Sequence, residues 1–106
     1  MNKVYKPQGY NSVSPYFIVH DAKKLTDLLV KVFNATEKRR YQRPDGSIVH
    51  MEMQIDDSVI MMSEATEQFP PIIQVVHVYV QDVDDVYRKA LQQGCEGIED
   101  PKERED

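Results

Sequence analysis

Many of the motifs that would assign a function to this 106-residue chain are missing from it. It has no Gly-rich phosphate loop, no Gly-x-Ser-x-Gly elbow and no Cys-x-x-Cys pair, so none of these motifs identifies its chemistry. Its single cysteine, Cys95, cannot form an internal disulfide. The sequence also lacks a signal-peptide pattern at its start and any run of about 18 apolar residues, the length that spans a bilayer. We therefore expect a cytoplasmic protein with no membrane contact.

An excess of positive charge is also absent. The formal net charge is -5, and the only basic cluster comprises Lys38, Arg39, Arg40 and Arg43. Surfaces that bind nucleic acid are usually rich in Lys and Arg, so we expect no nucleic-acid partner. The four basic residues are instead typical of a solvated strand edge, where charge deters unwanted pairing. The length and the 41% hydrophobic content fit one globular domain.

Two segments share one pattern of a strand, an Asp and an amphipathic helix. The first has a predicted strand over 13–20 and Asp21 as helix N-cap. The second has a predicted strand over 72–80 and Asp82 in the equivalent place. In the first predicted helix apolar residues recur at i, i+3, i+4, i+7 and i+8, which places them on one face, and the second predicted helix has the same spacing. These faces are Leu25, Leu28, Leu29, Val32 and Phe33, and then Val83, Val86, Tyr87, Ala90 and Leu91; the expected C-caps are Asn34 and Gly94.

Between the two segments the pattern alternates as strands do, over 38–43, 47–55 and 58–63. The alternation predicts one face with Ile48, His50, Glu52 and Gln54, and another with Val49, Met51, Met53 and Ile55. Residues 1–12 are predicted to be a flexible arm, residues 13–66 a first module, and residues 72–106 an incomplete second module with a short strand at Ile98. The chain thus belongs to the α+β class.

Three stretches resemble one known family when they are taken together. They are VSPYFIVHDAKKLTDLLVKVFNA (13–35), RPDGSIVHMEMQIDDSVIMMSE (43–64) and VHVYVQDVDDVYRKALQQGCEGIEDP (76–101). This ordered set is similar to the PhnB-like branch of the glyoxalase/bleomycin-resistance/dioxygenase superfamily, also called vicinal oxygen chelate proteins. The resemblance implies paired βαβββ modules whose sheets enclose a cavity. It also implies a divalent metal in many members, and dimers in many.

The sequence departs from that family in two respects. The last strands of the second module are not found before Asp106, so we expect a truncated second module. The positions that carry metal ligands in the metal-dependent members correspond to Ser14, Met61 and Val75. Thioether and aliphatic side chains are not ligands for a hard divalent ion, so the standard metal site is not expected.

Other residues could still carry chemistry. His50 and Glu52 share one strand face, which makes them, with His77, candidates for acid–base catalysis. If a metal binds, the candidate ligands are His50, Glu52 and Glu64. Candidate ligand-binding residues are Tyr16, Met61, His77 and Tyr79. The competing interpretations are a solvated polar strand face for His50 and Glu52, a core histidine for His77, and ordinary core packing for the Tyr and Met residues.

Three functions remain open at this point. The first is a domain that binds a small organic ligand in a sheet-lined cavity, with no cofactor. The second is a metal-dependent lyase, isomerase or dioxygenase of the same superfamily. The third is a non-catalytic domain that only dimerises. In each case we expect a homodimer that buries residues 72–80, because an unpaired apolar strand tends to pair with another chain.

Overall fold

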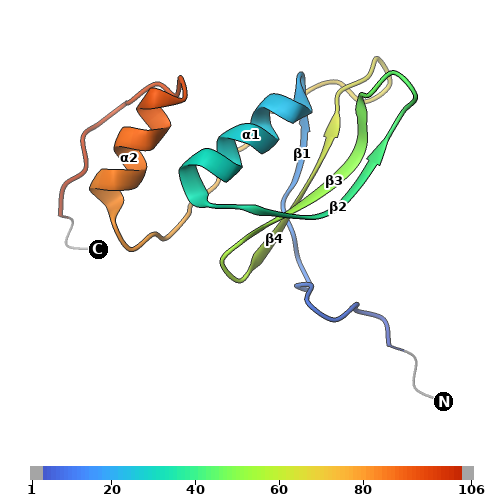
Figure 1. Ribbon diagram of the computed structural model, residues 1–106, viewed down its shortest axis with the longest axis horizontal. Coiled ribbons are helices and arrows are strands. Elements are labelled where there is room, and N and C mark those ends of the chain that lie inside the picture. The colour runs from blue at the N-terminus through green and yellow to red at the C-terminus, as the bar shows by residue number, and fades with distance from the viewer. Residues whose placement is uncertain (1–3, 104–106) are drawn as a thin grey trace.

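The computed structural model of the protein describes residues 4–103 (Figure 1). A four-stranded sheet has the order β1-β4-β3-β2, with β1 parallel to β4 and the other neighbours antiparallel. Helix α1 crosses one face of this sheet, and helix α2 lies beside α1 near the C-terminal end. The elements are β1 (Tyr16–Val19), α1 (Ala22–Phe33), β2 (Thr36–Gln42), β3 (Ile48–Ile55), β4 (Ser58–Glu64) and α2 (Val83–Gln92).

Both ends of α1 are capped as the sequence predicts. The Asp21 side chain accepts a hydrogen bond from the backbone N–H of Lys24 at 3.2 Å. At the other end Asn34 adopts a left-handed conformation, with φ 56°, and its N–H donates to the carbonyls of Leu29 and Val30. Asn tolerates this conformation better than most residues, so it ends the helix at low cost.

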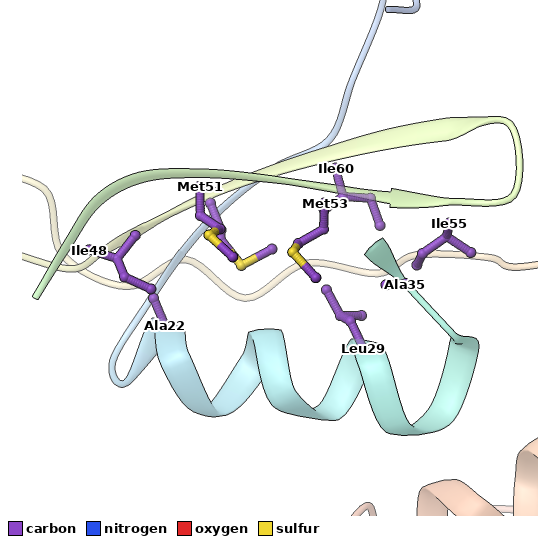
Figure 2. Packing of buried hydrophobic residues seen from close by; sticks show 9 residues of the cluster. Ala22, Leu29, Ala35, Ile48, Met51, Met53, Ile55 and Ile60 are labelled. Carbon is purple, nitrogen blue, oxygen red and sulfur yellow. The ribbon is translucent and has the colours of Figure 1, made fainter. Parts of the chain in front are cut away.

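The hydrophobic core lies between α1 and the sheet (Figure 2). Met51 and Met53 of β3 and Met62 of β4 are fully buried there, facing Leu29 of the helix. Methionine is unbranched and adapts to irregular gaps, which suits a small core. The expected apolar stripe of α1 is therefore confirmed at Leu29 and Val32, which are buried, and at Leu25, Leu28 and Phe33, which are partly buried.

The predicted alternation of side chains is wrong at the start of β3. Ile48 was expected on the face of His50, but it is 2% exposed and belongs to the core, whereas Val49 is 42% exposed. The cause is a shift of register, because Tyr41 pairs with His50 while Gln42 pairs with Ile48. An irregularity of this kind adds one residue to a strand and exchanges the faces beyond it. A second shift lies between Glu37 and Arg39.

The predicted strand over 72–80 does not form. Its backbone contributes one hydrogen bond within residues 4–103, from the N–H of Ile72 to the carbonyl of Ile18 at 3.0 Å. A strand needs a ladder of backbone hydrogen bonds along its length, and this segment meets β1 only at its start, where the Gln74 side chain also donates to the Tyr16 carbonyl at 2.6 Å. The short strand expected at Ile98 is also wrong, because Ile98 is 98% exposed and lies outside any strand.

Helix α2 forms as the sequence predicts but remains at the surface. Asp82 caps it by accepting from the N–H of Asp85 at 3.0 Å. The C-cap is Gln93, and the expected cap Gly94 follows it with φ 96°. None of the α2 residues is buried. Within residues 4–103, neither helix has the length and apolarity needed to cross a membrane.

Candidate ligand site on the open face of the sheet

The sheet has a second face, opposite α1, which we call the open face. It is defined here by Tyr16, Arg39, Tyr41, His50, Glu52 and Met61. Strand register brings these residues together, because Met61 pairs with both Tyr16 and Glu52, while Tyr41 pairs with His50 and Arg39 with Glu52. Tyr16 and Tyr41 are 38% and 54% exposed, so this face is accessible.

A chain of hydrogen bonds runs through the open face. Glu52 is 5% exposed, and its two carboxylate oxygens have different partners. Oε1 accepts from the hydroxyl of Tyr10, and Oε2 lies 2.8 Å from Nε2 of His50. The other ring nitrogen of His50, Nδ1, is 3.2 Å from the hydroxyl of Tyr16. A buried carboxylate is costly without such partners, and this chain supplies them.

The hydrogen-bond partners also set the ionisation of Glu52 and Tyr10. Burial raises the pKa of Glu52, but the hydrogen bonds from Tyr10 and His50 outweigh burial, and the pKa lies below its ordinary value. The hydrogen bond to Glu52 is in turn the largest cause of a raised pKa for Tyr10, followed by its partial burial. Glu52 is therefore an anion at neutral pH, and Tyr10 is a neutral hydrogen-bond donor.

Aromatic rings surround His50. The ring of Tyr16 lies 5.7 Å from that of His50, and the ring of Tyr41 lies 6.4 Å away, both tilted against it. These distances are typical of aromatic contacts. Beside Tyr10, the Lys38 ammonium lies 4.9 Å from the centre of the Tyr10 ring and 3.2 Å from Oε1 of Gln54. The open face thus combines flat apolar surfaces with a fixed acid–base pair.

The sequence reasoning missed three residues of this site: Arg39, which it assigned to a solvated strand edge, Tyr41, which it did not consider, and Tyr10. Tyr10 lies within the segment predicted to be a flexible arm, yet it and Asn11 both contact the sheet. Asn11 accepts from the N–H of Val59 at 3.1 Å and donates to the carbonyl of Asp57 at 3.4 Å. An aromatic residue and an asparagine in an otherwise polar segment are the only signals that could have indicated this contact.

The fold agrees with comparisons to known proteins. A sequence model of the Glyoxalase/Bleomycin resistance protein/Dioxygenase superfamily matches residues 10–106. The chain belongs to this superfamily. The family resemblance and the α+β glyoxalase-like fold expected from the sequence are confirmed.

Two proteins of known sequence are similar to this chain at 29% identity. An uncharacterised protein of Mycobacterium bovis is 29% identical over 97 residues, which cover 79% of this chain and 62% of that protein. An uncharacterised protein of Mycobacterium tuberculosis is 29% identical as well, with 79% and 56% covered. The chain therefore spans less than two-thirds of the length of these relatives.

Solved structures share the fold. TioX from Micromonospora sp. ML1 superposes with a TM-score of 0.62 at 18% identity, over 90% of this chain and 79% of TioX. The fosfomycin resistance protein FosX from Listeria monocytogenes gives a TM-score of 0.64 at 21% identity, over 81% and 71%. At these identities the similarity is one of fold.

The residues considered as metal ligands for a superfamily member do not come together. His50 and Glu52 are adjacent, but both oxygens of Glu64 accept from the start of α1, from the N–H of Asp21 at 2.7 Å and of Ala22 at 2.9 Å. A carboxylate at a helix N-terminus has a structural role there. Within residues 4–103 no group of three His, Cys, Asp or Glu side chains is arranged to hold a metal. The donor set does not fit a divalent ion.

The proposed ligand-binding residues divide between two places. Tyr16 and Met61 are register partners on the open face. His77 and Tyr79 lie in the segment after Ile72, with their rings 4.6 Å apart in a T-shaped contact, and they line a hollow of about 270 Å³ beside Ser58 and the β3–β4 turn. Tyr79 is 92% exposed. The segment that carries His77 and Tyr79 meets β1 at one point beside Tyr16, where Nε2 of Gln74 donates to the Tyr16 carbonyl at 2.6 Å.

Proposed function

We propose that the open face of the sheet binds a small organic ligand without a metal. The observation that carries this proposal is the buried Glu52 carboxylate, which fixes the His50 ring between Tyr16 and Tyr41. Binding sites for small molecules typically combine apolar and aromatic walls with a few oriented polar groups. Met61 supplies an apolar floor between β1 and β3. The shared fold of the fosfomycin resistance protein FosX is compatible with such a role.

Catalysis is a second candidate, and the His50–Glu52 pair favours it. A carboxylate that accepts from one imidazole nitrogen orients the ring and leaves the other nitrogen available for proton transfer. Here that nitrogen meets the hydroxyl of Tyr16. The pair could act as a general base in a lyase or isomerase reaction. A metal-dependent form of this candidate has less support, because the donor set does not fit.

Titration of the full chain with a library of small organic acids and phenols, followed by NMR of backbone amides, tests the binding proposal. We expect a ligand that shifts resonances of β1, β3 and β4 around Tyr16, His50 and Met61. His50→Ala should weaken its binding by about tenfold or more, as removal of an oriented polar contact and an aromatic surface does. The control is His77→Ala, which should leave the affinity unchanged because His77 lies elsewhere.

Two results would contradict the binding proposal. One is a ligand whose shifts are confined to residues 76–80 and whose affinity falls only in His77→Ala. The other is tight binding of divalent metal as the single response of the protein. The catalytic candidate requires that an activity found with a bound ligand is lost in His50→Ala and survives chelation.

A further inference from the structure

The hydrogen-bond chain determines which tautomer of His50 is present. Glu52 is ionised, so its oxygens can only accept, and His50 Nε2 must carry the proton that lies between them. In a neutral imidazole Nδ1 is then an acceptor. The hydroxyl of Tyr16, 3.2 Å away, therefore donates its proton to Nδ1.

This direction leaves Tyr16 with a defined role at the surface. Because the hydroxyl proton of Tyr16 points toward His50, the lone pairs of the Tyr16 oxygen are the part of the hydrogen-bond chain that remains available to a ligand. Tyr10, Glu52 and His50 have their polar atoms engaged with one another. The half-exposed Tyr16 hydroxyl is thus the open end of the chain, and it presents an acceptor.

The neighbouring strand supplies a positive charge at a suitable distance. Adjacent strands lie about 4.8 Å apart, and Tyr16 reaches from β1 across β4 to His50 on β3. β2 is the next strand beyond β3, and it carries Tyr41 opposite His50 and Arg39 opposite Glu52. Arg39 is exposed and forms no ion pair with a described residue. A planar molecule with a donor at one end and an anion at the other would span this interval.

We propose that Tyr16 selects the ligand and that the ligand class is a planar hydroxylated organic acid, such as a phenolic carboxylate. Its hydroxyl donates to the Tyr16 oxygen, its ring lies against Tyr16 and Tyr41, and its carboxylate meets Arg39. This inference rests on the proposed function and specifies the chemistry of that same site. Guanidinium groups bind carboxylates well, and flat rings pack against tyrosine.

The test compares para-hydroxybenzoate with para-methoxybenzoate, which keeps the ring and the carboxylate but has no donor. Calorimetry on the full chain should show the hydroxylated probe binding up to about tenfold more tightly, the upper effect of one hydrogen bond. Tyr16→Phe should remove this preference while para-methoxybenzoate still binds. Arg39→Gln should weaken both probes by the same factor. Tyr79→Phe, the control at an exposed tyrosine elsewhere, should change neither affinity.

Equal affinity of the wild-type protein for the two probes would overturn this inference, as would an unchanged preference in Tyr16→Phe. Failure of both probes to bind would overturn it as well. In each case the library titration decides the proposed function separately, since a ligand of another class that shifts the same resonances would leave that function standing.

Discussion

Residues 16–33 and 72–92 have the same order of apolar strand pattern, Asp cap and amphipathic helix, but they reach different structures. In the first segment the strand joins a sheet and Leu29 of the helix is 6% exposed. In the second, no strand forms and no residue of the helix is buried; Leu91, on its predicted apolar face, is 44% exposed. The N-cap hydrogen bond is nevertheless present in both.

The difference separates local from non-local causes of structure. A cap and a helical stripe act within one or two turns, so they operate in both segments. A strand and a core depend on partners that are distant in sequence: the first segment pairs with β4 along its strand and packs its helix on the sheet, whereas the second reaches the core only through Val78. Residues 72–80 thus retain the alternating exposure of a strand, with Ile73, Val75 and Tyr79 at 97%, 98% and 92%, without its hydrogen bonds.

The largest expected effect on the free energy of unfolding comes from introducing an aspartate on the apolar face of α1, in comparison with α2. Leu29→Asp should lower the free energy of unfolding by more than about 3 kcal/mol, because a buried leucine is lost and an unpaired charge is buried. Leu28→Asp should act in the same direction, since Leu28 packs against the core. Leu91→Asp is the matched control and should cost less than about 1 kcal/mol. Urea denaturation followed by circular dichroism measures all three; similar losses for Leu29→Asp and Leu91→Asp would abolish the distinction between the helices.

The second prediction concerns self-association through residues 72–80, which we propose pairs two copies of the chain. The segment carries no charge, and antiparallel pairing about Val76 would set Val75 opposite His77 and Ile73 opposite Tyr79. We expect sedimentation equilibrium to show a dimer of the 12.3 kDa chain and Val75→Lys to convert it to monomer, since charged edge residues block strand pairing. Ile98→Lys, at an equally exposed apolar residue, is the control. A wild-type monomer with a folded circular dichroism spectrum would refute the proposal, and with it the dimerising-domain alternative.

The third prediction tests the contact that only the first segment has between its helix and its sheet. Glu64→Ala should lower the free energy of unfolding by about 1–2 kcal/mol, because two backbone N–H groups lose a charged acceptor. Glu67→Ala, at an exposed glutamate three residues later, should change it by less than about 0.5 kcal/mol. Thermal denaturation in parallel gives both values, and equal shifts would show that Glu64 contributes nothing specific.

A fourth prediction follows from the lowered pKa of Glu52, for which the second segment has no counterpart. A carboxyl group with a lower pKa in the folded state stabilises the fold above its unfolded pKa and loses that contribution as pH falls through the folded pKa. Stability should therefore decline on acidification below the ordinary value of 4.5, and Glu52→Gln should make this decline less steep. Urea midpoints measured between neutral and acidic pH provide the comparison. Parallel curves for the two proteins would contradict the prediction.

The last comparison is between the two N-caps, and the smallest effect is expected at the second. Asp21→Ala should cost about 1–2 kcal/mol, because it removes the cap and places alanine at a φ of 61°. Asp82→Ala should change global unfolding by less than about 0.5 kcal/mol, since α2 buries no residue against the fold. Asp21→Gly, which relieves the backbone strain, should recover part of the loss. Equal costs at the two caps would mean that α2 unfolds together with the sheet.

The sequence predicted those features whose causes lie close together along the chain. Both helices, their N-caps, the Asn34 cap and the strands of the first module were expected within a few residues of where they occur. The proximity of His50 to Glu52 followed from strand alternation. Their partners did not, because Tyr10 and Tyr16 reach them through pairings across 42 and 34 residues of sequence.

The errors have the same origin. Ile48 was assigned to the wrong face because a register shift depends on how β2 meets β3, and the period of β3 alone does not contain it. Residues 72–80 have the composition of a strand, but composition does not provide a neighbour. Glu64 was considered as a metal ligand because the donors that its carboxylate accepts from, the N–H groups of Asp21 and Ala22, are 43 and 42 residues away in sequence.

The Glu64 contact also has a consequence for the order in which the protein folds. The first backbone N–H groups of a helix ordinarily have no partner within it and are satisfied by water or by nearby side chains. Here those of Asp21 and Ala22 are satisfied by the last residue of β4, so the first turn of α1 is complete only after β4 has docked beside β1. Formation of a β-hairpin such as β3–β4 takes about 1–10 μs, which is longer than the roughly 0.1–1 μs of helix–coil relaxation. Helix α1 should thus nucleate from its C-terminal half, and its first turn should become ordered in the same step that completes the sheet.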